Sequence, residues 1–161
     1  MKKQLLKMNL QVFARQKNAL RGHFIAPFKT GVEPKDADFL ELAKWIASVS
    51  DDTDEQTDDT GYMDGDGTPE TTVIGVSGSY GFEGSFDAED AAQAYVAGLK
   101  YKVGDDRKVW HKIVSADGKT QWLGTATISA IVAGAGDATA YEDFSCTITY
   151  NELPKETTVT P

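Results

Sequence analysis

The stretch Thr71-Thr-Val-Ile-Gly-Val-Ser-Gly-Ser-Tyr-Gly-Phe-Glu-Gly-Ser-Phe86 decides the fold of this chain. A glycine at every third position from Gly75 to Gly84 indicates a strand that is bent or closely packed. Apolar residues recur at even positions, and a period of two places them on one face of an extended strand. The stretch therefore predicts a β-strand whose core face carries Ile74, Val76, Tyr80, Phe82 and Phe86.

The residues directly after this strand change to a helical pattern. Asp87 is placed to cap a helix, and Glu89 and Asp90 would lie in its first turn, where the helix dipole favours acids. The apolar positions that follow share one side of such a helix. We predict a helix over residues 87–99 with an apolar side made of Ala91, Ala92, Tyr95, Val96 and Leu99.

Three further strands are predicted toward the C-terminus. Residues 107–115 lead into Asp117-Gly118, a hairpin turn signal. Residues 120–132 alternate, with Trp122 in phase with the core, and residues 141–150 alternate after a glycine-rich turn at 134–137. The expected inward side chains are Trp122, Ala126, Ile128, Ala130 and Val132, followed by Phe144, Cys146, Ile148 and Tyr150.

The residues before the deciding stretch are less regular. Pro27 limits residues 21–29 to an edge strand or an extended arm. Residues 34–46 are compatible with a short helix in their first half, and we expect a strand after residue 43. Residues 51–69 are acidic and almost free of apolar side chains, so they predict a long, extended loop.

These elements predict a mainly β protein with one helix, folded as an antiparallel β-sandwich or a partly closed barrel. Its 161 residues, 40% of them hydrophobic, suffice for one core. The predicted organisation is an N-terminal basic arm at 1–35, a β domain at 36–152 and a loose C-terminal tail at 153–161. No segment is apolar enough for a membrane span or a signal peptide, and Met8 is an alternative start.

Charge is distributed unevenly along the chain. Residues 1–32 contain seven basic side chains and no acid, whereas the residues between Lys44 and Lys100 contain thirteen acids and no base. Such polarity suggests that the arm of one copy meets the acidic face of another, although a solvated arm and loop explain it equally well. The candidate contact residues are Asp51, Asp52, Asp54, Glu55, Asp58, Asp59, Arg15, Lys17 and Arg21.

No combination of residues predicts catalysis or a cofactor. His23 and His111 have no second histidine at a ligand spacing, and His111 is expected to be a half-buried strand residue. Cys146 alternates with core residues, and a single cysteine agrees with a reducing cytosol. The turn Asp64–Gly67 lacks the spacing of an EF-hand, so calcium binding there is only a weak alternative. Nucleophile-elbow, dinucleotide and phosphate-loop motifs are missing. We predict no enzyme activity, cofactor or metal site.

From Trp45 to Pro154 the chain resembles the major tail tube proteins of long-tailed, siphovirus-type bacteriophages of Gram-positive hosts. The resemblance lies in the order of its parts: a strand, an acidic loop, a glycine-rich strand, a helix, and two closing strands. The stretches that carry it are Gly61-Tyr-Met-Asp-Gly-Asp-Gly67, Val73-Ile-Gly-Val-Ser-Gly-Ser-Tyr-Gly-Phe-Glu-Gly84, Gly124-Thr-Ala-Thr-Ile-Ser-Ala-Ile131 and Phe144-Ser-Cys-Thr-Ile-Thr-Tyr150. The segment Met8–Ala14 is similar to the N-termini of other phage structural proteins.

The resemblance implies a structural subunit of the virion tail, assembled in the host cytoplasm. Six copies would form a ring by sheet pairing, and stacked rings would make the tube that conducts DNA during ejection without binding it specifically. The implied partners are other copies, the tape measure, terminator and distal tail proteins, and no membrane. A tail terminator, a contractile inner tube, or a β-sandwich module binding carbohydrate through Trp45, Trp110 and Trp122 are the alternatives.

Overall fold

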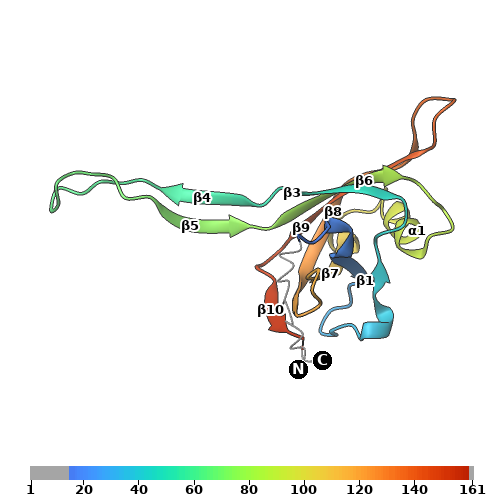
Figure 1. Ribbon diagram of the computed structural model, residues 1–161, viewed down its shortest axis with the longest axis horizontal. Helices are drawn as coiled ribbons and strands as arrows, with labels where there is room; N and C mark the ends of the chain where they lie inside the picture. The colour runs from blue at the N-terminus through green and yellow to red at the C-terminus, as the bar shows by residue number, and fades with distance from the viewer. Residues whose placement is uncertain (1–14, 160–161) are drawn as a thin grey trace, which may run out of the picture.

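The computed structural model describes residues 15–159, which form one strongly curled antiparallel sheet, one α-helix and a long projecting hairpin (Figure 1). The strand order is β2-β1-β7-β8-β9-β6-β3, and β10 pairs with β8 beyond the end of β9. The strands of this sheet are β1 (Gly22–Pro27), β2 (Leu40–Glu41), β3 (Ile46–Asp51), β6 (Ser79–Ser85), β7 (Lys108–Val114), β8 (Thr120–Ala135), β9 (Asp143–Tyr150) and β10 (Lys155–Thr158).

The sheet curls into a half-barrel, which is the partly closed form of the predicted fold. His23 of β1 contacts Phe82 of β6 with ring centroids 5.1 Å apart, although β7, β8 and β9 separate these two strands within the sheet. Such a contact across the concave side requires strong curvature. The core fills this side, and its fully buried large side chains include Ile25, Phe82, Val109, Ile128, Phe144 and Ile148.

The predicted helix exists but is shorter than expected. It is α1 (Ala91–Gly98), and its cap is Asp90, whose carboxylate accepts a hydrogen bond from the Gln93 backbone N–H at 3.0 Å. Asp87 lies outside the helix. Ala92, Val96 and Leu99 pack into the core and Tyr95 packs against it as predicted, because their spacing brings them onto one side, whereas Ala91 is exposed and was wrongly predicted. Short 3-10 turns complete the chain: η1 (Asn18–Leu20), η2 (Asp36–Asp38) and η3 (Gly104–Arg107).

The acidic segment is not a structureless loop. Its first part is β4 (Asp54–Asp58), which pairs with β5 (Thr72–Ser77), so residues 52–78 form a two-stranded hairpin arm with a tip at 59–71. Figure 1 shows this arm extending far from the half-barrel. The glycine-rich stretch is therefore divided at Gly78. Only Tyr80, Phe82 and Phe86 pack with the core, whereas Ile74 and Val76 are exposed on the arm.

Three other expectations were wrong in part. The section of the predicted arm from Gly22 to Pro27 is strand β1, paired with β7 along its whole length and with β2 at Phe24 and Ile25. The predicted loose tail contains β10. A bulge at Ala130, whose φ is +49°, reverses the alternation of β8, so Ile131 is buried in place of Val132. Residues 1–14 of the predicted arm, and 160–161, lie outside the described residues.

Candidate self-assembly interface

The curled sheet does not close on itself, so it presents free strand edges. Within the described residues, β3 pairs with β6 alone and forms one edge of the sheet. The other edge is β2, which is only two residues long. The backbone N–H and C=O groups along the outer side of β3 are available to another strand. A second copy that supplied such a strand would extend the sheet.

The hairpin arm carries exposed apolar side chains. A bulge in the pairing places Thr57 opposite Val73 while Glu55 lies opposite Val76, so Val73 and Val76 occupy the same face of the arm. Val73 is 51% and Val76 42% exposed, and Ile74 beside them is 66% exposed. On this projecting ribbon these three apolar side chains remain about half exposed within their own chain. They are typical of a surface that another protein covers.

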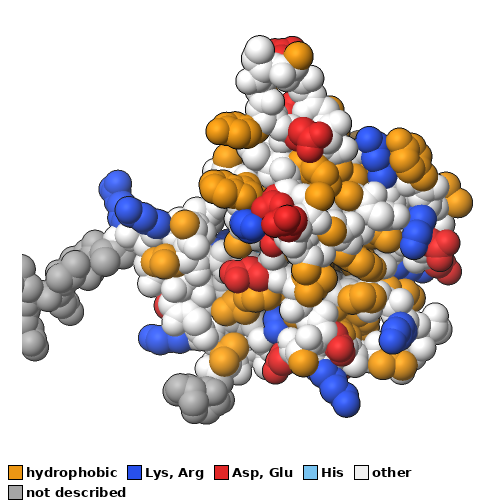
Figure 2. Space-filling view, turned by 90° about the vertical axis from the view of Figure 1, so that its right-hand side faces the viewer, with side chains coloured by type: hydrophobic (Ala, Val, Ile, Leu, Met, Phe, Trp, Pro, Cys, Tyr) orange, Lys and Arg blue, Asp and Glu red, His pale blue; other side chains and the backbone are white. Residues whose placement is uncertain are grey.

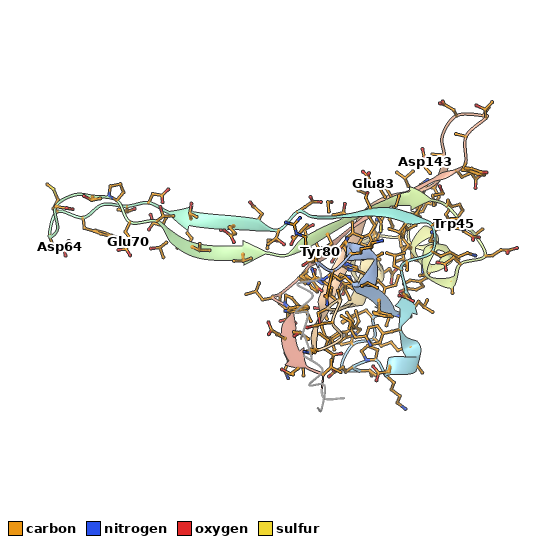
Figure 3. All side chains as sticks on the ribbon, in the orientation of Figure 1. Trp45, Asp64, Glu70, Tyr80, Glu83 and Asp143 are labelled. Carbon is orange, nitrogen blue, oxygen red and sulfur yellow. The ribbon has the colours of Figure 1, made fainter. Side chains whose placement is uncertain are left out.

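The outer face of four adjacent strands is built mainly from small polar residues, with Val132 of β8 and Asp143 of β9 at its border. Pairing aligns Ser50, Gly81, Thr147 and Ser129 in one row across β3, β6, β9 and β8. Neighbouring rows contain Ser79, Thr149 and Thr127, then Ser48, Glu83 and Ser145. We call these ten residues the hydroxyl face. Figure 3 shows Glu83, its only charged member, on the side of β6 away from the body, opposite to Tyr80.

The outer face of the next strands has the opposite character. Trp110 of β7 lies against Phe28, with ring centroids 6.4 Å apart. Lys112 of the same strand lies 4.1 Å from the centre of the Phe39 ring and 3.1 Å from the Asp36 carboxylate. Aromatic and cationic groups of this kind are absent from the hydroxyl face. One sheet thus presents an aromatic and lysine-containing surface on β7 and β1, and a mainly uncharged polar surface on β3, β6, β9 and β8.

The predicted acidic contact residues are all on or beside the hairpin arm. Asp54, Glu55 and Asp58 lie on β4, Asp59 begins the tip, and Asp51 and Asp52 lie where the arm leaves the half-barrel. The last two also have local roles. The Asp51 carboxylate accepts a hydrogen bond from the Thr53 backbone N–H at 3.1 Å, and the Asp52 carboxylate accepts one from the Ser50 hydroxyl at 3.0 Å. Asp54 and Glu55 are exposed and are the residues best placed to meet another copy.

The predicted basic residues lie before β1. Arg15 and Lys17 are exposed, and the Arg21 guanidinium lies 5.4 Å from the centre of the Trp122 ring. The ion pairs among residues 15–159 are Lys44–Asp87, Lys108–Asp105 and Lys112–Asp36. None of these joins the predicted basic set to the predicted acidic set. A contact between the two sets therefore stays a prediction about different copies.

The titratable groups of the interior are structural. His23 and His111 are buried with nitrogen atoms 3.4 Å apart, so neither the arm position of His23 nor the half-buried state of His111 was correctly predicted. Cys146 is buried, as predicted, and burial raises the pKa of its thiol to about 12. Among the described residues, no group of three or more His, Cys, Asp and Glu side chains could hold a metal ion.

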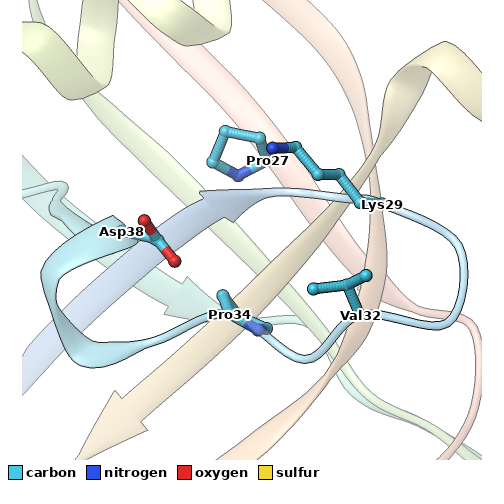
Figure 4. A pocket seen from close by; sticks show the side chains of 5 residues that line it. All are labelled: Pro27, Lys29, Val32, Pro34 and Asp38. Atoms are coloured by element: carbon cyan, nitrogen blue, oxygen red, sulfur yellow. The ribbon is translucent and has the colours of Figure 1, made fainter.

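A small pocket of about 160 Å³ lies beyond the end of β1 (Figure 4). It is lined by Pro27, Lys29, Val32, Pro34 and Asp38, and Figure 4 shows the Lys29 and Asp38 side chains on opposite sides of Pro27. This lining contains one base and one acid without a nucleophile, so it offers no triad geometry. Within residues 15–159, none of the helices has the length and apolar character needed to cross a lipid bilayer.

Comparisons with solved structures identify the architecture. A chain in the tail of an empty gene transfer agent (GTA) particle, refined helically with C6 symmetry, superposes with a TM-score of 0.65 at 17% identity, covering 89% of this chain and 99% of that one. The chain has the tail-tube fold. A chain of the virion of a native GTA particle gives a TM-score of 0.61 at 15% identity, covering 84% and 95%.

A more distant likeness is to the sheath–tube complex of an extracellular contractile injection system, called PVC, in its extended state. Its TM-score is 0.49 at 13% identity, covering 85% of this chain and 88% of that one. No protein-family model matches the sequence, and no curated protein matches it either. At identities of 17% and 15%, the two GTA matches establish the fold alone.

Proposed function

We propose that this protein is the structural subunit of a phage-type virion tail tube, in which copies associate side by side into rings and the rings stack. The observation that carries the proposal is the match of almost the whole chain to a subunit of a helical tail, together with the free edge of β3. An open half-barrel removes its unpaired edges by pairing with further copies. We assign six copies to a ring by analogy with the C6 symmetry of the GTA tail.

The hydroxyl face is the part of the sheet best suited to line a channel for DNA. Its ten residues are Ser, Thr and Gly apart from Glu83, so it contains no Lys or Arg to hold phosphate and no aromatic ring to stack on bases. Side chains this short also leave a smooth wall. DNA would pass such a wall without adhering to it. The aromatic and lysine-rich face of β7 and β1 would then lie away from the channel.

The hairpin arm would reach a copy in the neighbouring ring. Its face with Val73 and Val76 supplies apolar area, and its acids supply charge for setting the register. The proposed partners of these acids are Arg15, Lys17 and Arg21 of that copy. The siphovirus type, the Gram-positive host, and contacts with tape measure, terminator and distal tail proteins follow from the resemblance and stay predictions.

Electron microscopy of the purified full-length protein tests this function. Negative staining should show rings or tubes about 10 nm wide, the scale set by a closed wall of such sheets. Asp54→Lys combined with Glu55→Lys should block tube growth and leave the circular dichroism spectrum of the subunit unchanged. Glu33→Lys, which also reverses an exposed acid, is the matched control and should leave tubes intact. A concentrated sample that stays monomeric, alone and with other tail components, would refute the proposal.

A further inference from the structure

A pocket of about 490 Å³ lies at the N-terminal end of α1, on the side of the molecule opposite to the hairpin arm. Three segments line it: the connection before β3, the end of β6, and the β8–β9 connection. The lining residues are Trp45, Ser85, Phe86, Asp87, Tyr141 and Glu142, which we call the aromatic pocket. Figure 2 faces this side and shows hydrophobic side chains interleaved with acidic ones.

Two of the three aromatic side chains of this pocket, those of Trp45 and Tyr141, are exposed, and the backbone at Trp45 is strained. Trp45 has a φ of +58°, a conformation that bulky side chains rarely adopt, yet its side chain does not enter the core and the residue is 64% exposed. Tyr141 across the pocket is 88% exposed. The Trp45 side chain therefore gains no burial in the core that would offset the strain of its backbone. Strain of this kind persists where a site is held ready for a function.

A buried amide holds the strained segment in place. Gln93 is fully buried, and its Nε2 donates hydrogen bonds to the Lys44 carbonyl at 2.6 Å and the Ser85 carbonyl at 3.2 Å. Its Oε1 accepts a hydrogen bond from the Asp87 backbone N–H at 2.7 Å. The Trp45 carbonyl accepts a further hydrogen bond from the Ser85 N–H at 3.0 Å. The pocket wall is thus fixed before any partner arrives.

The pocket is negatively charged. The Lys44 ammonium lies 2.7 Å from the Asp87 carboxylate, and this hydrogen bond is the largest cause that lowers the pKa of Asp87. Lys44 offsets only one of the two carboxylates, because Glu142 is exposed and forms no ion pair in the described part of the chain. Two aromatic rings beside carboxylates suit a partner that combines apolar and cationic groups.

The same chain presents such a group at the other end of α1. Lys100, Tyr101, Lys102 and Val103 follow the helix, and we call them the basic knob. Tyr101 is 90% and Val103 80% exposed, and both lie between or beside lysines. The knob is also held rigidly. The Arg107 guanidinium donates hydrogen bonds to the carbonyls of Lys100 at 2.6 Å and of Lys102 at 2.7 Å.

We propose that the basic knob of one copy docks into the aromatic pocket of a neighbouring copy. An eight-residue helix, about 12 Å long, separates the two surfaces within a chain, so they cannot meet in the same molecule. A contact between two different patches is heterologous, and repeated contacts of this type produce closed rings or open filaments. Tyrosine is a frequent hot-spot residue at such interfaces. The acidic tip of the hairpin arm, in contrast, would be repelled by the pocket carboxylates.

The proposal names one contact of the assembly described above and rests on that assembly. Mixed-disulfide trapping tests it directly, because the single native cysteine is buried and its thiol pKa is raised to about 12. Full-length Val103→Cys protein is mixed under mild oxidation at assembling concentration with Ala140→Cys protein, whose thiol lies beside Tyr141 at an exposed position and leaves the pocket rings in place. We expect a covalent dimer of one copy of each. Met63→Cys, which replaces a fully exposed residue at the tip of the arm, is the control partner. Equal trapping with the control, or no trapping with Ala140→Cys, overturns the contact.

Variants give a second readout. Trp45→Gly removes the indole and also relieves the positive φ, so the dilute subunit should unfold at the same or a higher temperature. Its critical concentration for tube formation should nevertheless rise at least roughly tenfold, as for loss of one hot spot. Lys102→Glu and Glu142→Lys should each raise this concentration, and the double variant should restore it in part. A wild-type chain that never associates overturns both proposals. Wild-type tubes together with unaffected variants overturn the knob and pocket contact alone.

Discussion

Acid should unfold this protein through its buried histidine pair. The rings of His23 and His111 are stacked with an interplanar angle of 14°, and their nitrogens Nδ1 and Nε2 lie 3.4 Å apart. Both rings touch aromatic side chains, and neither forms an ion pair with a carboxylate in the described part of the chain. A proton on either ring would place an uncompensated charge among apolar groups.

The size of this loss of stability follows from the pKa values of the two histidines in the folded and the unfolded state. Burial, with a smaller contribution from Arg21, lowers the pKa of His23 to about 4. Burial, with a smaller contribution from His23, lowers the pKa of His111 to about 3. In the unfolded chain both values return to about 6.5. Below pH 6.5 the unfolded state therefore binds protons that the folded state excludes, and the free energy of unfolding falls as pH falls from 6.5 toward 4.

At pH 4.5 each histidine is about two units below its unfolded pKa, which corresponds to roughly 2.7 kcal/mol, or about 5 kcal/mol for the pair. Loss of this size is comparable with the whole stability of a small domain. Urea unfolding of the dilute subunit at pH 7, 6, 5 and 4.5, followed by tryptophan fluorescence, measures it. The double variant His23→Leu/His111→Leu removes both partners of the contact at similar volume and cannot titrate.

The double variant His23→Leu/His111→Leu separates the effect of histidine titration on the free energy of unfolding from the effect of carboxylate titration. Asp87 has a lowered pKa because of Lys44, so its contribution is present at neutral pH and is lost as pH falls through its folded pKa in both proteins. Only the wild type should show the additional loss between pH 6.5 and 4.5. If the free energies of unfolding of the two proteins fall in parallel over this range, the reasoning about buried neutral histidines is wrong.

Two further predictions concern a close backbone contact and the channel wall. Gly84→Ala should lower the free energy of unfolding by about 1–3 kcal/mol, because its Cβ would overlap the Trp45 carbonyl oxygen, a backbone atom that cannot rotate out of the way as a side chain can. The matched control is Gly98→Ala in α1, where no atom lies within 4 Å of an added Cβ and the stability should not fall; urea unfolding distinguishes them. Thr147→Arg combined with Ser129→Arg should leave tube formation intact but slow the ejection of DNA from reconstituted particles, most strongly at low salt. Thr157→Arg on β10, outside the hydroxyl face, should leave ejection unchanged, and equal slowing by both would contradict the assignment of the wall.

Regular alternation made the C-terminal half predictable. Phe144, Cys146, Ile148 and Tyr150 are all buried because β9 is central in the sheet and has apolar side chains only on its concave side. The turn at Asp117-Gly118 also forms as its sequence indicates, with Gly118 at a φ of +71°. Where a strand keeps one periodicity from end to end, the sequence is sufficient to predict which of its side chains are buried.

Prediction failed where pairing between strands overrode the local strand propensity of the sequence. β4 has the sequence Asp-Glu-Gln-Thr-Asp, which has little strand propensity, and it is a strand because β5 supplies a partner with β-branched side chains. Ile74 and Val76 have the even spacing of Phe82 in the sequence, but they lie on the arm beyond Gly78, where a bulge interrupts the alternation of β5. Periodicity identifies which side chains share a face. It does not tell whether the body of the protein or another molecule covers that face.

Only the charged residues of the candidate interface could be predicted from the sequence. Asp54 and Glu55 were identified from the acidic run, but the hydroxyl face depends on the register of four strands that are distant in sequence. The strained Trp45 and its supporting Gln93 gave no sequence signal, because a positive φ and a buried amide are properties of the packed structure.

Folding and association are carried by different residues in this chain. The core is complete within one copy, since the side chains that meet across the concave side include His23, Phe82 and Tyr150 from strands at both ends of the sheet. The outer edge of β3, the apolar face of the arm, the basic knob and the exposed Trp45 and Tyr141 of the aromatic pocket lie outside that core. A subunit of this kind can fold first and polymerise afterwards, because association satisfies sheet edges and exposed apolar groups and adds nothing to the core. Assembly should therefore respond to surface substitutions and salt, whereas stability of the subunit should respond to pH and to the core.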